Sequence, residues 1–313
     1  MNLRKCTRKH PMLKETFLLD DLPKLQPDQV GLAVLGHPIK HSISPEIHTA
    51  ALKVLADSSE EFSRWSYHKI EVEPASLAKA LPILADHGYR GLNLTIPHKV
   101  DVLPHLSLMD EQARIMGAVN TLSWENGAWK GYNTDGIGLS KAIEDAFTIT
   151  LKEFQVIVLG AGGAARAAVA QCIFEGCEKV AIYNRSIDRA QLLSSALKEN
   201  ELNQEVLILE SFLNPFAGSK EPVLIINATS LGLKSEDPSP VDLTEVDGNF
   251  YVYDMVYNPA VTRLMTEAKK KSYPVANGLG MLVGQAARSL EIWSGREVSI
   301  EAMSEAARAA ISR

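Results

Sequence analysis

The chain has 313 residues, of which 46% are hydrophobic and 22% are charged, so its length and composition predict an ordinary globular protein of about two domains. Its formal net charge is −6 and its mean hydropathy is −0.04. Neither value gives a general attraction to nucleic acid or to an anionic membrane surface, and we expect neither as a partner.

The first 29 residues differ from the rest of the chain. They begin with a basic cluster between Arg4 and Lys14 and become acidic between Asp20 and Asp28. No apolar stretch follows the basic cluster, which argues against a secretory signal. We expect a mobile tail or an extension without strands, and the sequence assigns it no function.

The cysteines are Cys6, Cys172 and Cys177, whose spacing is not that of a metal site. Cys172 and Cys177 fall in a helix-like stretch and just past it, so we interpret them as small buried apolar residues. We expect no metal, and a reducing cytoplasm as the default location.

Strand and helix signals alternate from residue 31 onward. We expect strands over 31–36, 65–72 and 90–96, one helix that begins at Ser44, and another helix over 74–87. Ser44 is expected to be the N-cap of its helix, with Pro45 at the first helical position. Residues 118–124 and 128–132 flank Glu125-Asn126-Gly127 and predict a hairpin. This order predicts a parallel or mixed sheet.

A second unit is expected after a helix over 136–147. Strands are predicted over 154–159, 179–184, 206–210, 223–227 and 250–254, with helical segments between some of them. The chain is predicted to be helical from residue 278, because Leu282, Ala286, Leu290 and Trp293 recur at helical spacing. The fold class is therefore α/β, with two domains.

A glycine-rich turn follows the first strand of the second unit. Gly160-x-Gly162-x-x-Ala165 lies between that strand and an alanine-rich helix, which is the context of a dinucleotide-binding loop. The first glycine permits a tight turn, the second lets the backbone approach a pyrophosphate, and the helix N-terminus attracts the anion. The pattern predicts nucleotide binding.

The end of the next strand indicates which nucleotide. An NAD site usually has Asp or Glu here, whereas this chain has Asn184-Arg185-Ser186 and then Arg189. A guanidinium can pair with a 2′-phosphate through charge-assisted bonds, so NADP is favoured over NAD. A plainer interpretation is that Ser186 is a helix N-cap and Arg185 a solvent-facing side chain. This interpretation is compatible with binding of a 2′-phosphate.

Lys99 is the leading candidate for proton transfer. Pro97 cannot donate to a sheet ladder, so it ends the preceding strand and leaves Lys99 at the carboxyl end, where open α/β sheets bind ligands. A carboxylate nearby, such as Asp135, would hold the ammonium and suit it to exchange a proton with an alcohol. Taken alone, Lys99 is more often a surface lysine and Asp135 is more often a helix N-cap.

Ser42 and Ser44 lie two residues apart just before a helix. In an extended segment this spacing puts both hydroxyls on one side, where they suit a carboxylate ligand.

The chain resembles the shikimate/quinate dehydrogenase family from about residue 31 to the C-terminal helices. The resemblance is carried by His41-Ser42-Ile43-Ser44-Pro45, Asn93-Leu94-Thr95-Ile96-Pro97-His98-Lys99, Gly117-Ala118-Val119-Asn120-Thr121, Asn133-Thr134-Asp135-Gly136, the 160–165 loop, Asn184-Arg185-Ser186, Asn227-Ala228-Thr229-Ser230, the segment from Asp254 through Met255 and Tyr257 to Pro259, and the segment from Gly278 through Met281 to Gln285. Leu94 and Ser186 replace the commoner valine and threonine of the family.

The resemblance implies a role for each matched position. Lys99 and Asp135 would be the catalytic pair. The residues implied to bind the substrate are Ser42, Ser44, Thr95, Asn120, Tyr257 and Gln285. Those implied to bind NADP are Gly160, Ala161, Gly162, Gly163, Ala164, Asn184, Arg185, Ser186, Arg189, Thr229, Met255 and Gly278.

The family also implies a domain order and an activity. Residues 30–134 with 278–313 would form the substrate-binding domain, 135–277 a Rossmann-type NADP-binding domain, and 1–29 an extension. The expected activity is NADP-dependent shikimate dehydrogenase, with a quinate or dual enzyme using NAD and a non-catalytic NADP-binding regulator as alternatives. A tetrahydrofolate-linked dehydrogenase would leave the serine pair and Gln285 unexplained. Monomer and homodimer both stay open.

Overall fold

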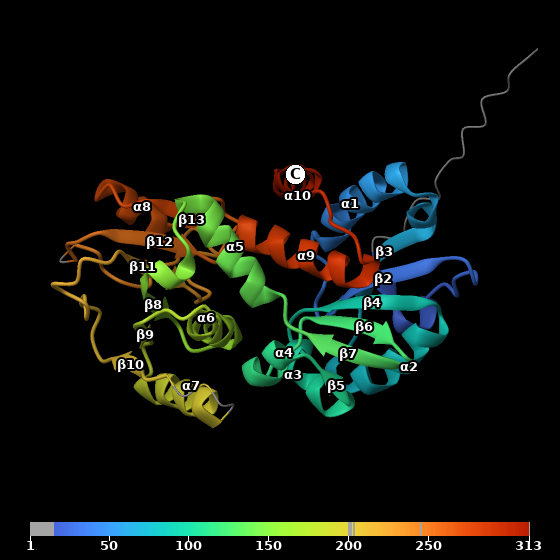
Figure 1. Cartoon of the computed structure of the whole chain (residues 1–313), viewed down its shortest axis with the longest axis horizontal. Coiled ribbons are helices and arrows are strands. Elements are labelled where there is room, and N and C mark those ends of the chain that lie inside the picture. The colour runs from blue at the N-terminus through green and yellow to red at the C-terminus, as the bar shows by residue number, and fades with distance from the viewer. Residues whose placement is uncertain (1–15, 200–201, 203, 245, 313) are drawn as a thin grey trace, which may run out of the picture.

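The computed structural model describes residues 16–199, 202, 204–244 and 246–312, and it confirms a two-sheet α/β architecture (Figure 1). The first sheet has seven strands in the order β1-β3-β2-β4-β6-β7-β5. Its strands are β1 (Phe17–Leu18), β2 (Val30–Gly36), β3 (Trp65–Glu71), β4 (Tyr89–Leu94), β5 (Leu108–Met109), β6 (Thr121–Glu125) and β7 (Ala128–Tyr132). β1 to β4 run parallel, and β6 is antiparallel to both β4 and β7, so the sheet is mixed.

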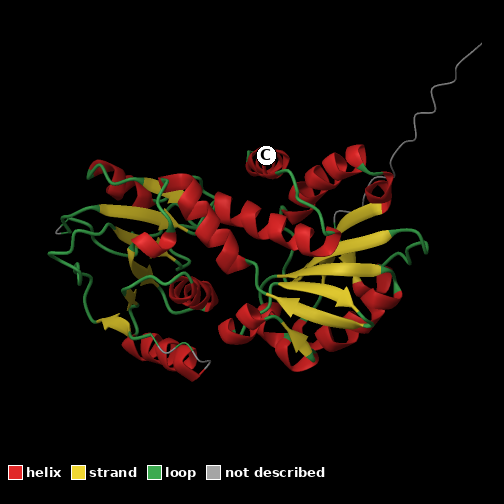
Figure 2. Ribbon diagram, in the orientation of Figure 1, coloured by secondary structure: helices red, strands yellow, loops and turns green. Residues whose placement is uncertain are grey.

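Helices cover both faces of this sheet (Figure 2). They are α1 (Ser44–Ser58), α2 (Leu77–Asp86) and the short α3 (His98–Asp101) and α4 (Glu111–Met116). Strand β2 shows why both faces are covered: Ala33 and Leu35 pack with the α2 side, whereas Leu32 and Val34 pack with α1 and the C-terminal helices. Because β2 is buried on both faces, its residues form the continuous apolar run seen in the sequence.

The second sheet has six parallel strands in the order β10-β9-β8-β11-β12-β13. They are β8 (Gln155–Leu159), β9 (Val180–Tyr183), β10 (Val206–Leu209), β11 (Val223–Asn227), β12 (Phe250–Asp254) and β13 (Val275–Asn277), with helices α6 (Gly163–Phe174), α7 (Ile187–Glu199) and α8 (Arg263–Lys270). This is the Rossmann strand order, whose switch point between β8 and β11 is where dinucleotides bind.

Three further helices join the two sheets. α5 (Asp135–Phe147) and α9 (Leu279–Ser294) cross between them, and α10 (Ile300–Ile311) packs on α1 (Figure 1). The crossing is close because glycines meet: a Cβ placed on Gly284 would lie 3.1 Å from Gly138 Cα. The C-terminal helices therefore return to the first sheet after the second has been built.

The structure confirms the hairpin and the predicted strands, whose ends agree with the prediction to within three residues. Asn126 and Gly127 form its two-residue turn with φ of 52° and 81°, as the right-handed twist of a hairpin requires. Cys172 and Cys177 are buried and free.

Several short elements were not predicted, namely β5, α3, α4 and β13, because two to six residues show no measurable periodicity.

Two expectations about local structure are wrong. The extension is not free of strands, because β1 pairs with β3 and Leu22 is buried; the edge of β3 offers unpaired backbone groups that β1 satisfies. Residues 1–15 lie outside the described part. Ser44 is not the N-cap of α1 but its first residue, and Ile43 occupies the cap position. Among the described residues, no helix is long and apolar enough to cross a membrane, and no cluster of His, Cys, Asp or Glu could hold a metal ion.

Candidate active site

A cavity of about 510 Å³ lies between the two sheets and brings together residues from distant parts of the chain. Its lining includes the whole predicted catalytic pair and every predicted substrate-binding residue: Ser42, Ser44, Thr95, Lys99, Asn120, Asp135, Tyr257 and Gln285. Ala164, Met255 and Gly278 line it from the nucleotide side. The carboxyl ends of β4 and β12 both open onto this space, as expected for the ligand crevices of α/β sheets.

Lys99 reaches the cavity from α3, whose N-cap is Pro97. The preceding strand β4 already ends at Leu94, so Pro97 does not end it as predicted but leads into the helix. His98 anchors this short helix, because its buried ring places Nε2 2.8 Å from the carbonyl oxygen of Val72. The amide of Val119 also donates to the Lys99 carbonyl at 2.8 Å. The backbone around Lys99 is therefore held on two sides while its side chain remains 34% exposed.

Asp135 meets Lys99 from the start of α5. Lys99 Nζ donates to Asp135 Oδ2 at 2.6 Å, and Asn120 Nδ2 donates to the other oxygen, Oδ1, at 2.9 Å. The Asp135 side chain is only 11% exposed, so water screens the ion pair weakly. The N-cap interpretation of Asp135 is wrong: Thr134 occupies the cap position, which frees the Asp135 carboxylate to face the lysine.

The serine pair lies together at the N-terminus of α1. Ser42 Oγ donates to Ser44 Oγ over 3.2 Å and accepts from the Ser44 amide over 3.3 Å. The two hydroxyls are therefore on one side, as the spacing predicted. Thr95 and Gln285 line the same cavity, and the Asn120 amide lies 3.4 Å from Gln285 Oε1.

The nucleotide side of the cavity is formed by the loops after β12 and β13. Met255 and Tyr257 follow β12, and Gly278 follows β13. A Cβ on Gly278 would lie 2.1 Å from the carbonyl oxygen of Met255, so only glycine fits there. Burial raises the pKa of Tyr257, which keeps its hydroxyl protonated and able to donate.

The glycine loop leads from β8 into α6. Gly160 has φ of +112°, a conformation that side chains disfavour, and Gly162 is the N-cap of α6. Nothing lies within 4 Å of a Cβ built on Gly162 or Gly163, so the loop presents an open surface at a helix N-terminus. Thr229 lies beside Gly160, and its hydroxyl donates to Asn227 Oδ1 at 2.7 Å.

The residues predicted to select NADP lie outside the 510 Å³ cavity, after β9. Asn184 Nδ2 donates to the Ser186 carbonyl at 2.7 Å, which shapes the turn into α7. Arg185 and Arg189 are both exposed. Ala161 belongs to the loop but, like Gly160, Gly162 and Gly163, it does not line that cavity.

Sequence reasoning missed a layer of buried polar residues next to the cavity, one of which, Asn93, also lines it. Asn93, Thr121, Thr134 and Ser289 are each at most 6% exposed and are joined by hydrogen bonds. Asn93 lies between Leu92 and Leu94 near the end of β4, and that contrast was the available signal for it, whereas β6 (Thr-Leu-Ser-Trp-Glu) offered none for Thr121.

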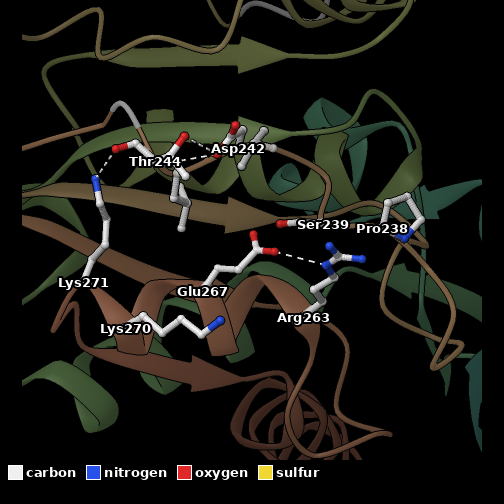
Figure 3. Close-up of a pocket in the computed structure, with 10 residues that line it drawn as sticks. Pro238, Ser239, Asp242, Thr244, Arg263, Glu267, Lys270 and Lys271 are labelled. Carbon is white, nitrogen blue, oxygen red and sulfur yellow. Dashed lines mark hydrogen bonds and ion pairs between the residues drawn. The ribbon is translucent and has the colours of Figure 1, made fainter.

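A second cavity of about 490 Å³ is drawn in Figure 3. It lies between the 238–244 segment and α8, and none of the predicted site residues lines it. Its charges are partly paired: Arg263 Nε lies 3.1 Å from Glu267, and Lys271 donates to the Thr244 carbonyl (Figure 3).

Comparison with known proteins assigns three parts of the chain. Residues 34–122 match the model of the shikimate dehydrogenase substrate binding domain. Residues 141–215 match the model of shikimate/quinate 5-dehydrogenase, and residues 278–308 match that of the shikimate 5'-dehydrogenase C-terminal domain.

Relatives cover nearly the whole chain. The shikimate dehydrogenase (NADP(+)) of Methanococcus aeolicus is 35% identical over 277 residues, which is 88% of this chain and 95% of that protein. The crystal structure of shikimate 5-dehydrogenase from Thermus thermophilus in complex with NADP(H) and shikimate is 35% identical with a TM-score of 0.77, covering 90% of this chain and 100% of that one. Quinate dehydrogenase from Corynebacterium glutamicum in complex with NAD has a TM-score of 0.77 at 25% identity, covering 90% and 99%. This chain is a member of the shikimate dehydrogenase family.

Proposed function

We propose that the protein is an NADP-dependent shikimate dehydrogenase, which interconverts 3-dehydroshikimate and shikimate on the route to chorismate and the aromatic amino acids. The observation that carries the proposal is the 2.6 Å bond between Lys99 and Asp135 inside a cavity that also holds the serine pair. A lysine held by a carboxylate can exchange a proton with an alcohol, and two hydroxyls opposite it can hold a carboxylate. Shikimate carries both groups.

NADP fits the residues of the second sheet. The open glycine loop at the start of α6 suits a pyrophosphate, and Asn184 stands where an NAD site has a carboxylate. Exposed Arg185 and Arg189 would hold the 2′-phosphate, with Ser186 in the same loop after β9. Thr229 follows β11 and lies beside Gly160, so it would contact the nucleotide near the glycine loop. When bound, NADP supplies the hydride exchange that converts alcohol to ketone.

The chain's own residues would orient the substrate and move its hydroxyl proton. In the proposed arrangement Ser42 and Ser44 bind the carboxylate, while Thr95, Asn120, Tyr257 and Gln285 bind the ring hydroxyls. Lys99 then faces the reacting hydroxyl, and Asp135 keeps its ammonium in place. Acting as the acid and base and stabilising a developing alkoxide both require the same position of Lys99.

The two sheets suggest which part of the chain binds the substrate and which binds the cofactor. We assign 30–134 with 278–313 to substrate binding and 135–277 to NADP binding, because α9 and α10 pack on α1 although they follow the second sheet. The extension 1–29 contributes β1 to the first sheet. Free buried Cys172 and Cys177 suit a reducing cytoplasm, which fractionation of cells would test.

The test of substrate and cofactor is steady-state kinetics with shikimate and quinate, each with NADP⁺ and NAD⁺. We expect the highest kcat/KM for shikimate with NADP⁺. A preference for quinate with NAD⁺ would instead support the dual or quinate enzyme, whose relative binds NAD. Binding of NADP⁺ without turnover of either substrate would support a regulator.

The test of mechanism is Lys99→Ala. We expect kcat to fall by at least about a thousandfold while the Kd for NADP⁺, measured by fluorescence, stays within twofold. Lys141→Ala is the matched control, because Lys141 pairs with Asp145 at 2.9 Å on the exposed face of α5. Turnover close to wild type in the Lys99 variant would reject the proposed role.

A further inference from the structure

A buried cluster of hydroxyl and amide groups adjoins the proposed active site, whose cavity Asn93 also lines. It joins Asn93 on β4, Thr121 on β6, Thr134 at the start of α5 and Ser289 on α9. Thr121 and Ser289 are completely buried. None of the roles assigned above uses these two hydroxyls, yet a buried polar group is costly unless its bonds are satisfied, so the cluster needs an explanation.

The direction of the hydrogen bonds can be deduced from the ends of the cluster. Burial raises the pKa of Tyr67, so its hydroxyl stays protonated and donates to Asn93 Oδ1 at 2.8 Å. The Asn93 amide nitrogen must then face the other way, where it donates to Thr121 Oγ1 at 3.1 Å and to Ser289 Oγ at 2.9 Å. Thr121 has one proton, which is available to Asn120 Oδ1 when Ser289 donates its own proton across the 2.8 Å contact with Thr121 Oγ1.

That proton goes to the residue that holds Asp135. Thr121 Oγ1 donates to Asn120 Oδ1 at 3.1 Å, and the Thr134 amide donates to the same oxygen at 2.8 Å. With two donors on Oδ1, the Asn120 amide can have only one orientation, in which Nδ2 points to Asp135 Oδ1 at 2.9 Å. Reversing the amide would bring a carbonyl oxygen against a carboxylate.

Ser289 connects this arrangement to α9. Its hydroxyl lies 2.8 Å from Thr121 Oγ1, one helical turn from Gln285 on α9. The cluster thus joins the helix that carries Gln285 to the strand that follows Asn120. We infer that Thr121 and Ser289 are positioning residues, which fix Asn120 and through it the Asp135–Lys99 pair.

The inference rests on the proposed function, and Thr121→Val tests it most directly. Valine keeps the shape of threonine and suits a strand, but it can neither donate to Asn120 nor accept from Asn93. We expect kcat and kcat/KM for shikimate to fall together by about tenfold, because the lost constraint acts on the geometry of proton transfer. Thr121→Ser keeps the hydroxyl and should stay within twofold of wild type.

A double-mutant cycle separates positioning from a general loss of packing. In an Asn120→Ala background, Thr121→Val should change kcat by less than twofold, because the residue through which it acts is gone. Ser289→Ala, on a different element, should lower kcat by about fivefold and serves if the valine variant does not fold. Ser140→Ala is the control, since its hydroxyl bonds Gln171 outside the cluster.

Each outcome decides the inference. Wild-type kcat in both Thr121→Val and Ser289→Ala, an equal loss in Thr121→Val and Thr121→Ser, or an undiminished loss in the Asn120→Ala background would each overturn it. Failure of the proposed function appears separately, as a wild-type enzyme that does not turn over shikimate. The cycle can then be run with whichever cyclic alcohol the wild type oxidises.

Discussion

The crossing of α5 and α9 allows a direct test of how closely these two helices pack between the two sheets. A Cβ on Gly138 would lie 2.7 Å from the backbone nitrogen of Gln285 and 2.8 Å from the carbonyl oxygen of Met281. A Cβ on Gly284 would lie 3.1 Å from Gly138 Cα. The same Gly→Ala change therefore meets backbone at both positions, but the approach is about 0.3–0.4 Å closer at Gly138 than at Gly284.

These distances give an expected difference in stability. Alanine stabilises a helix interior relative to glycine by about 1 kcal/mol, and this gain is common to both variants. Ordinary contact needs about 3.5 Å, so Gly138→Ala must separate the helices by roughly 0.7 Å, an overpacking that costs about 1–3 kcal/mol. We expect Gly138→Ala to be less stable than Gly284→Ala by about 1–2 kcal/mol in the free energy of unfolding.

The separation should also reach the active site. Gly138 lies one turn after Asp135, and Gly284 precedes Gln285. A shift of several tenths of an ångström between these helices should lower kcat in Gly138→Ala by about tenfold.

Urea unfolding at pH 7 gives the stability difference, and shikimate kinetics give the rate. If Gly138→Ala is as stable as Gly284→Ala, the helices do not approach as closely as described and the reasoning is refuted.

Two further predictions concern the cofactor and pH. Arg185→Ala should raise the Kd for NADP⁺ by about 10- to 100-fold through loss of a charge-assisted bond, and leave the Kd for NAD⁺ within twofold; equal effects on both, measured by titration, would exclude contact with the 2′-phosphate. Burial lowers the pKa of His48 to about 3, so the unfolded chain, with histidines near 6.5, binds a proton there that the folded chain does not. The contribution of neutral His48 to the free energy of unfolding is therefore fully present above about pH 6.5 and is lost as the pH falls from there towards 3. His48→Phe, which keeps the ring stacked on Tyr67, should reduce this loss by about 1.4 kcal/mol per pH unit between pH 6.5 and 4, and an unchanged slope in urea unfolding would contradict it.

The local pattern of the chain was sufficient for most strands and for the chemistry of the loops. β8 followed by Gly160 to Ala165 and an alanine-rich helix was predictable, because a buried parallel strand, a glycine turn and a helix each have a short-range signal. The Asn126-Gly127 turn was predictable for the same reason. β1 and β13 were not, since two or three residues become strands only when a neighbouring strand offers its edge.

The candidate site also has features that the sequence predicts and features that depend on the tertiary structure. The sequence by itself determined which side chains could transfer a proton, hold a carboxylate or bind a 2′-phosphate, because those abilities belong to residue types and their immediate neighbours. Only the tertiary structure decided that Lys99, Asp135, Asn120 and Gln285 meet in one cavity, and that Asp135 faces a lysine instead of capping its own helix. These contacts join residues up to 165 positions apart, and their geometry depends on how α5 and α9 pack between two sheets. No local pattern encodes that packing.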